Sequence, residues 1–238
     1  MDNLPDATET HLKAGGLRIL QPRRGYRFSV DALLVCDFVR LRRADRVLDL
    51  GAGCGVIALV LAARHPGVRI TALELQRDMA GLAAENVRRN GLEGRIQVIE
   101  GDLNNIAGLM DAGVIDHVVT NPPYRSPFAG RLCGRPGEAL ARHEILTDLA
   151  RLLSAARHAL RPGGRISLVY PADLTVKLLS AMRGVNLEPK RMRMVHPGPG
   201  AQARLVLVEG SKDAGEELKV LPPLFLEEWQ AVEKQTVC

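Results

Sequence analysis

The segment Asn121-Pro122-Pro123-Tyr124 has the side chains needed to hold a flat amino group. Its two prolines fix φ and keep the local backbone rigid. The side-chain oxygen of Asn121 and the carbonyl of Pro122 can each accept one hydrogen of a planar amine, while Tyr124 stacks on the group that carries it. Such a nitrogen is a poor nucleophile, and two acceptors on its hydrogens direct its lone pair toward an electrophilic methyl group. The alternative is an Asn-Pro turn with a solvent-facing tyrosine.

A glycine-rich turn lies in VLDLGAGCG, residues 47–55, where a predicted strand is followed by Gly51, Gly53 and Gly55. Glycine is needed where the backbone bends sharply or where a ligand must approach without meeting a Cβ atom. The G-x-G-x-G spacing differs from the G-x-G-x-x-G that places a pyrophosphate on a helix N-terminus. Alone, the pattern is also compatible with a strand-to-helix turn that binds nothing.

Two acidic residues follow the next two predicted strands. Glu74 lies 23 positions after Gly51 and can accept both hydroxyls of a ribose, and Asp102 can accept from an adenine amine. Each alone is also typical of a turn or helix cap. Because ligands of such sheets lie beyond the carboxyl ends of the strands, we expect these groups to converge on one cofactor site.

The elements that must position these residues alternate between strand and helix. The predicted strands are Arg46–Leu50, Arg69–Leu73, Ile96–Glu100, Ile115–Thr120 and Arg165–Tyr170, and the predicted helices are Val56–Arg64, Arg77–Asn90 and Ile145–Leu160. This alternation predicts an α/β fold with a doubly wound, mostly parallel sheet. Two further strands, near Arg191–His196 and Arg204–Glu209, flank Pro197-Gly198-Pro199-Gly200, which predicts an antiparallel hairpin at one edge and seven strands in all.

The two ends are predicted as additions to this core. Residues 1–43 form an arm and a helix at the substrate entrance, 44–210 the main domain, and 211–238 a surface-hugging tail. Within the arm, Ala14–Gln21 resembles a hairpin around Gly15-Gly16, and Asp31–Val39 is a predicted helix with Ser29 as its N-cap.

Composition limits the classes of function. The chain has 238 residues, 46% hydrophobic and 25% charged, which indicates a packed domain rather than disorder. It has no apolar run of about 20 residues and no secretory signal, so we expect a cytoplasmic protein without a membrane partner. The four cysteines and six histidines do not cluster, and we expect no metal. A net charge of +5 is compatible with a phosphate-rich partner.

Taken together, VLDLGAGCG, Glu74 and NPPY resemble the class I S-adenosylmethionine-dependent methyltransferases of the amino-methylating branch, with their Rossmann-like sheet. The resemblance narrows to the bacterial tRNA-valine adenine-N6 methyltransferases and covers about residues 12 to 225. It is carried by GYRFSVDALLVCDF (25–38), ARHE (141–144), LRPGGRISLVYP (160–171), KRMRMVHP (190–197) and the closing LVEG…LPPL. It implies S-adenosylmethionine as cofactor and, as RNA substrate, the adenine beside the anticodon of tRNA.

The resemblance also implies residue roles. The cofactor would contact Gly51, Gly53, Gly55, Glu74 and Asp102, with Asp49 supporting the glycine turn. The target amine would be held by Asn121, Pro122 and Tyr124. The methionine end or the base entrance would be lined by Arg27, Phe28 and Ser29, although a plain helix cap is equally open for Ser29. Arg142 and His143 would touch phosphate or, alternatively, begin a solvated helix. A tRNA-facing rim would include Arg23, Arg24, Arg131, Arg135, Arg191 and Arg193.

Three other functions use the same features. A glutamine-amide methyltransferase of release factors shares NPPY but usually carries a separate N-terminal helical domain, for which the roughly 40 residues before the first strand are too few. A guanine-N2 methyltransferase of ribosomal RNA is a second alternative. A catalytically silent RNA-binding factor is a third, although it needs neither the glycines nor NPPY. The oligomeric state is left open.

Overall fold

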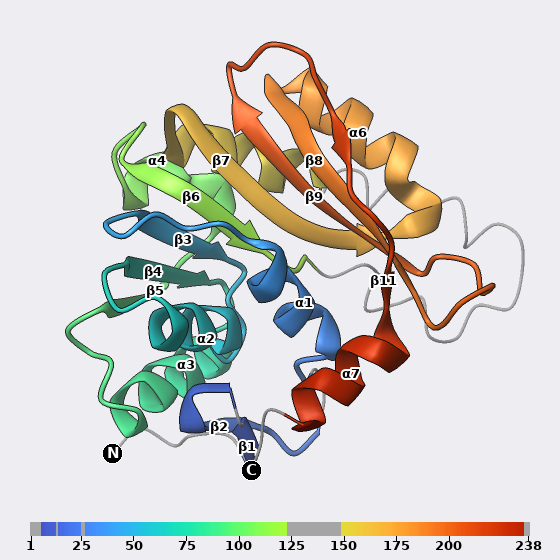
Figure 1. Cartoon of the computed structure of the whole chain (residues 1–238). Coiled ribbons are helices and arrows are strands. Elements are labelled where there is room, and N and C mark those ends of the chain that lie inside the picture. Colours follow the sequence, from blue (N-terminus) through green and yellow to red (C-terminus); the bar gives the residue numbers. More distant parts are fainter. Residues whose placement is uncertain (1–5, 13, 25–26, 123–148, 236–238) are drawn as a thin grey trace, which may run out of the picture.

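Five parallel strands form one side of the sheet in the computed structural model, which describes residues 6–12, 14–24, 27–122 and 149–235 (Figure 1). They are β3 (Arg46–Leu50), β4 (Arg69–Glu74), β5 (Ile96–Glu100), β6 (Ile115–Thr120) and β7 (Leu160–Pro171). Their order across the sheet is β7-β6-β3-β4-β5. The chain therefore reverses its direction of winding between β3 and β6, and ligands of such sheets bind at the carboxyl ends of the strands beside this point.

The predicted hairpin consists of β8 (Leu187–His196) and β9 (Leu205–Lys212), and β9 pairs antiparallel with both β7 and β8. The predicted mostly parallel sheet with an antiparallel hairpin is thus confirmed; strands β3 to β9 are the predicted seven, and two more bring the sheet to nine within the described residues. Two short strands from the C-terminal segment, β10 (Lys219–Val220) and β11 (Leu224–Phe225), pair parallel with β8. They cover part of an edge that would otherwise expose unpaired backbone groups.

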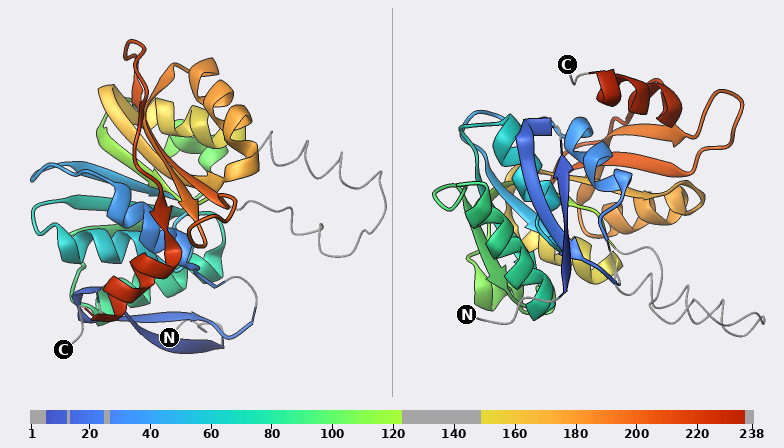
Figure 2. Two further views of the ribbon diagram at one scale, coloured as in Figure 1. Left: turned by 45° about the vertical axis from the view of Figure 1, so that its right-hand side comes forward. Right: turned by 90° about the horizontal axis from the view of Figure 1, so that it is seen from below.

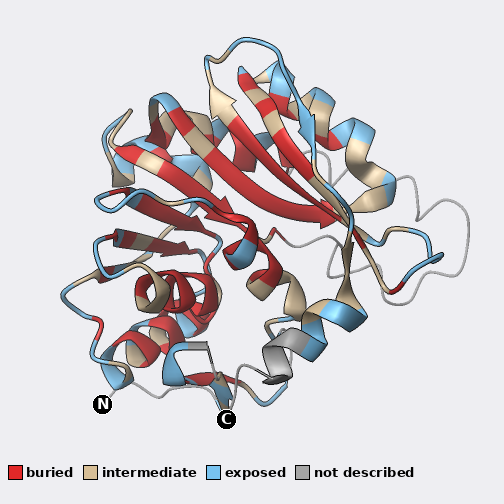
Figure 3. Ribbon diagram, in the orientation of Figure 1, coloured by how far each residue is buried: buried red, intermediate tan, exposed pale blue. Residues whose placement is uncertain are grey.

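Helices cover both faces of the sheet. One face packs against α1 (Val30–Phe38), α2 (Val56–Arg64) and α3 (Arg77–Arg89). The other packs against α4 (Ile106–Leu109), α6 (Thr175–Gly184) and the helical residues 149–159. Burial is concentrated in the strands and in α2, whose residues before Arg64 are all apolar (Figure 3). Short 3₁₀ turns also occur within the described residues, namely η1 (Ala14–Gly16), η2 (Leu103–Asn105) and η3 (Ala172–Leu174).

Both ends of the described chain lie against the layer that contains α1 to α3. The arm is a hairpin of β1 (Ala7–Leu12) and β2 (Leu17–Pro22), and it crosses the lower side of the molecule in the left view of Figure 2. The C-terminal helix α7 (Leu226–Gln235) is held to α1 by Trp229, whose indole N–H donates to Asp37 Oδ2 at 2.5 Å. Asp37 also pairs with Arg64 of α2. Within the described residues, the C-terminal segment is therefore held to the rest of the chain through β10, β11 and Trp229.

Candidate functional site

The predicted cofactor and amine-binding segments meet at one edge of the sheet. Register pairs Leu50 at the end of β3 with Leu73 of β4, and Glu74 with Glu100 at the end of β5. On the other side, β6 pairs with β3 and ends at Thr120, directly before Asn121. The carboxyl ends of four adjacent parallel strands therefore bring these segments together, as the sequence predicts.

The glycine loop after β3 is held by its backbone. The N–H groups of Gly51 and Ala52 both donate to the carbonyl of Leu73, at 2.9 and 3.0 Å. Gly51 has a φ of 77°, a left-handed conformation that disfavours side chains. A Cβ atom added there would meet nothing within 4 Å. The outer side of the loop is thus open, which leaves room for a ligand to approach the backbone closely.

Glu74 links this loop to the end of β4. Its Oε2 accepts from the N–H of Gly53 at 2.7 Å, and its Oε1 accepts from the N–H of Gln76 at 2.9 Å. The residue is only 7% exposed. Because each carboxylate oxygen has two lone pairs, both can accept a further hydrogen bond. The predicted ribose contact stays a prediction, and the geometry gives Glu74 an additional task, which is to hold the glycine loop.

Asp49 is fully buried beneath the loop. Its Oδ2 accepts from the N–H of Ala58 in the first turn of α2, at 3.1 Å, while its Oδ1 bonds to no described residue. Burial raises the pKa of Asp49 to about 7, the Ala58 hydrogen bond opposes this rise, and the charge of Glu74 adds to it. The carboxyl group therefore fixes the end of the loop, because it accepts a hydrogen bond from the first turn of the following helix.

Asp102 is exposed and caps η2. Its Oδ1 accepts from both the backbone N–H and the side-chain amide of Asn104, at 2.8 and 2.7 Å. The helix-cap alternative is therefore what the geometry shows directly. Because this cap uses Oδ1, Asp102 retains acceptor capacity at Oδ2 for the predicted adenine amine.

The amine-binding segment begins at a fixed point. The hydroxyl of the fully buried Thr120 donates to the carbonyl of Leu50 at 2.7 Å, which ties the end of β6 to the start of the glycine loop. Asn121 is half-buried and Pro122 is buried. Tyr124, Arg142 and His143 lie outside the described residues, as do Arg131 and Arg135.

The predicted entrance residues precede α1. Arg27 and Ser29 are exposed, while Phe28 is half-buried and packs against the core. Ser29 occupies the N-cap position, but its hydroxyl makes no capping bond to the helix backbone. It instead hydrogen-bonds the carboxyl group of Asp31. Burial raises the pKa of Asp31, and the hydrogen bond from Ser29 opposes this rise in part. The hydroxyl-capping prediction for Ser29 is therefore wrong.

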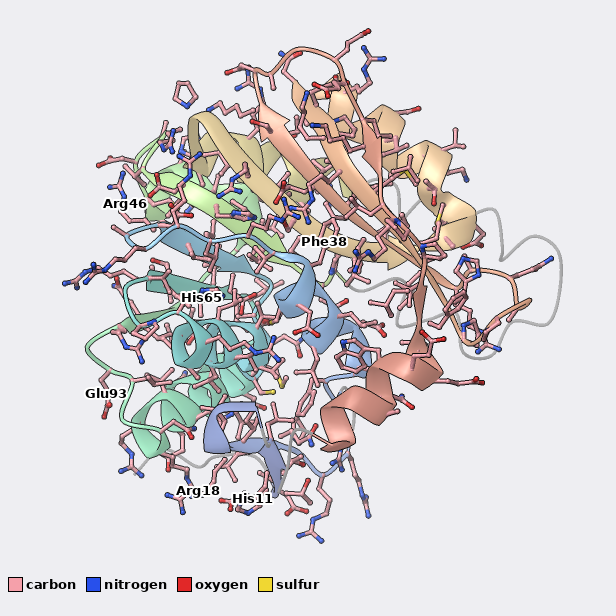
Figure 4. The ribbon with its side chains drawn as sticks, viewed as in Figure 1. His11, Arg18, Phe38, Arg46, His65 and Glu93 are labelled. Carbon is pink, nitrogen blue, oxygen red and sulfur yellow. The ribbon has the colours of Figure 1, made fainter. Side chains whose placement is uncertain are left out.

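The predicted RNA rim needs one correction. Arg191 is 9% exposed, its Nη1 lies 3.2 Å from both carboxylate oxygens of Glu209, and its Nη2 donates to the carbonyl of Phe38 at 3.1 Å. Its guanidinium also stacks on the Phe38 ring, at the end of α1 in Figure 4. Arg191 thus braces α1 against β8 and β9 and does not face RNA. Arg23 and Arg24 are exposed, and Arg193 is half-buried.

Two residues at this edge were missed by the sequence analysis. Thr120 directly precedes NPPY, and a hydroxyl at the end of a buried strand is a weak signal that it bonds a neighbouring strand. Leu75 follows Glu74 and is 63% exposed, which is unusual for a large apolar side chain. The exposed side chain of Leu75 is therefore available for contact with a ligand bound next to Glu74.

Other kinds of site receive no support from the described part of the chain. No group of three or more His, Cys, Asp and Glu side chains is placed there to hold a metal ion. No helix within the described ranges is long and apolar enough to cross a membrane. A surface groove of about 370 Å³ lies at the amino ends of β3 to β6, lined in part by Arg46, Arg69 and Arg95. It is at the opposite end of the strands from the glycine loop.

Comparisons with known proteins agree with this geometry. The model of the methyltransferase small domain matches residues 30–187. A tRNA1(Val) (adenine(37)-N6)-methyltransferase of Parabacteroides distasonis is 34% identical and is aligned over 75% of this chain and 74% of its own. A protein of the same name from Aeromonas hydrophila is also 34% identical, over 78% and 77%. A predicted O-methyltransferase of Agrobacterium tumefaciens has a similar crystal structure, with a TM-score of 0.68, 25% identity and coverage of 82% and 87%.

Proposed function

This chain belongs to the methyltransferase small domain family, among the tRNA1(Val) (adenine(37)-N6)-methyltransferases, and we propose that it methylates the N6 amine of an adenine in tRNA, beside the anticodon of a valine tRNA. It is an S-adenosylmethionine-dependent methyltransferase. One observation carries the proposal. The buried hydroxyl of Thr120 joins the start of the amine-binding segment to the start of the glycine loop, so that a methyl donor and a planar amine bound there would be neighbours.

The donor set fits the cofactor. The open outer side of Gly51 leaves room for it, Glu74 has acceptor capacity for ribose hydroxyls, and Asp102 has it for an adenine amine. Leu75 is proposed to cover the adenine face. Bound S-adenosylmethionine supplies an electrophilic methyl group on a sulfonium.

The chain itself activates the nucleophile. Asn121 Oδ1 and the Pro122 carbonyl are proposed to accept the two N6 hydrogens of the target adenine, and Tyr124 to stack on its ring. These acceptors work most strongly as positive charge develops on the nitrogen, so they stabilise the transition state more than the bound substrate. Arg27, Phe28 and Ser29 are proposed to line the entrance, and Arg142 and His143 to contact phosphate.

The RNA partner also bears on where the protein works. Because tRNA is the proposed substrate, we propose that the enzyme acts in the cytoplasm. The relatives' names favour an adenine of tRNA over the glutamine amide of release factors and over guanine in ribosomal RNA. No described feature favours a catalytically silent factor.

The deciding experiment measures methyl transfer from labelled S-adenosylmethionine to unmodified tRNA, ribosomal RNA and release factor, followed by nucleoside analysis. We expect N6-methyladenosine in tRNA alone. Asn121→Ala should lower turnover by roughly 10²-fold, on the scale of lost oxyanion-hole donors, with cofactor affinity unchanged. Gln97→Ala, an exposed amide near the start of β5, is the matched control and should be neutral. Near-normal turnover of Asn121→Ala would show that the amine is not held in this way.

A further inference from the structure

Asn86 of α3 is a fully buried amide whose bonds reach two separate segments. Its Oδ1 accepts from the N–H of Leu20 at 2.7 Å, and its Nδ2 donates to the carbonyl of Leu20 at 2.8 Å. The second hydrogen of Nδ2 goes to the carbonyl of Cys54 at 2.9 Å. Every donor of this side chain is used, and a buried amide with complete hydrogen bonding fixes the groups around it.

The bonds to Leu20 belong to a wider contact between α3 and the arm. One helical turn after Asn86, Asn90 accepts from the N–H of Arg18 at 3.0 Å and donates to its carbonyl at 2.8 Å. Arg18 and Leu20 are alternate residues of β2, so their outward-facing backbone groups lie on one edge of the strand. Two asparagines four residues apart on one helix face therefore make the hydrogen bonds to β2 that a neighbouring strand would otherwise make. Figure 4 shows Arg18 beside His11, its partner in the hairpin.

The bond to Cys54 reaches the glycine loop. Cys54 lies between Gly53 and Gly55, and the N–H of Gly53 donates to Glu74. The same face of α3 also contacts this loop one turn earlier, since a Cβ atom added at Gly55 would lie 3.2 Å from the Cβ of Ala83. Within the described residues, Asn86 is thus the side chain whose hydrogen bonds join the arm directly to the loop.

We propose that Asn86 is a positioning residue that couples the N-terminal arm to the cofactor loop, so that docking of the arm and binding of the cofactor stabilise each other. The inference rests on the assignment of the glycine loop to the cofactor. Because coupling between two sites is reciprocal, a ligand that orders the loop also orders the arm, and a loosened arm weakens ligand binding. The arm leads into α1 through the predicted entrance residues, so the coupling also links cofactor binding to the substrate side.

A matched pair of variants separates this role from simple stability. Asn86→Leu removes the bonds to both the arm and the loop, whereas Asn90→Leu removes bonds to the arm and leaves Cys54 untouched. Affinity for S-adenosylhomocysteine is measured by calorimetry on the full chain, with melting temperature in parallel. Because the coupling is reciprocal, we expect Asn90→Leu, which loosens the arm alone, to weaken binding about two- to threefold, and Asn86→Leu, which also frees the Cys54 carbonyl, to weaken it about tenfold or more. Unchanged affinity in Asn90→Leu at a lowered melting temperature would show that the arm is not coupled to the loop, and unchanged affinity in Asn86→Leu would reduce Asn86 to a structural residue.

A second measurement uses the unaltered protein, so it does not depend on a variant that folds. Hydrogen exchange of the Arg18 and Leu20 amides is followed with and without S-adenosylhomocysteine. We expect both amides to exchange several-fold more slowly with the ligand. If the amides of the glycine loop slow while those of β2 do not, the coupling is refuted and the cofactor site stands. If the unaltered protein does not bind the ligand at all, the cofactor assignment itself fails, and the coupling with it.

Discussion

The buried carboxyl group of Asp49 predicts a stability that depends on pH in an unusual direction. Its pKa is raised from 3.8 to about 7, chiefly by burial. Between these values the folded protein retains a proton that the unfolded chain has lost. The contribution of Asp49 to the free energy of unfolding is therefore fully present below pH 4 and is lost as pH rises to about 7. This is opposite to the usual contribution of a carboxylate that is paired in the native state.

The magnitude follows from the shift. About three pKa units correspond to about 4 kcal/mol of unfolding free energy, at 1.36 kcal/mol per unit. Asp49→Asn removes the ionisation and keeps an oxygen that can accept from Ala58. Its new amide hydrogens are buried, which costs about 1–3 kcal/mol at every pH if they stay unpaired. The informative quantity is therefore the difference between the two proteins as pH changes.

The assay is urea denaturation of the cofactor-free proteins at pH values from 4 to 8.5. Carboxyl groups that do not interact with Asp49 titrate alike in both, so the difference curve reports the ionisation of Asp49 together with its interaction with Glu74. We expect the variant to gain about 4 kcal/mol relative to the unaltered protein between pH 4 and pH 8, mostly below pH 7. If the unfolding free energies of the two proteins change in parallel over this pH range, Asp49 ionises with an ordinary pKa, and the reasoning from its burial is refuted.

Three further predictions follow from the site. Gly51→Ala and Gly91→Ala both place a side chain at positive φ in open space, so calorimetry should show similar losses of stability. Cofactor binding should weaken only in Gly51→Ala, and equal cofactor affinity in the two variants would contradict the approach of the cofactor to the open side of the loop. Thr120→Val leaves the carbonyl of Leu50 without its donor and should lower turnover about tenfold in the methyl-transfer assay, whereas a neutral effect would remove the link between the two segments. The logarithm of the RNA association constant should fall with the logarithm of the salt concentration, with a slope of about 0.7–0.9 per phosphate contact. Arg24→Gln should reduce this slope by about one contact, whereas Arg191→Gln should lower the melting temperature instead. A slope that Arg24→Gln leaves unchanged would remove this residue from the rim.

The sequence predicted the central strands and α2 closely because each is a short apolar run bounded by glycine, proline or charge. It missed the early start of β7 at Leu160, because Pro162-Gly163-Gly164 is typical of a chain break. The strand continues because Leu160 pairs with Ile115 across a register irregularity, which accommodates the extra residues. The strands β10 and β11 have two residues each, too few for any periodic pattern.

The misassigned and missed side chains share a physical cause. Arg191 lies in a strand and carries a charge, so local pattern predicts exposure, yet its partners Phe38 and Glu209 are distant in the sequence and become neighbours only after folding. Asn86 likewise lies on a buried helix face, where a polar residue conflicts with amphipathic patterning. That conflict is the one signal the sequence contains, because a polar residue within an apolar stripe requires bonding partners.

Three of the five residues from Gly51 to Gly55 are glycines, which have no side chain to pack, and the hydrogen bonds around the loop compensate for this. Its backbone from Leu50 to Cys54 is fixed by four groups on three other elements, namely the Leu73 carbonyl and the Glu74 carboxylate of β4, the Thr120 hydroxyl of β6 and the Asn86 amide of α3. Each of these groups bonds to backbone N–H or C=O of the loop, so none occupies the open side at Gly51. A cradle fixed in this way is ordered before its ligand arrives, and less conformational entropy is lost on binding. The glycines give the ligand access, and the bonds from neighbouring elements supply the rigidity that glycine lacks.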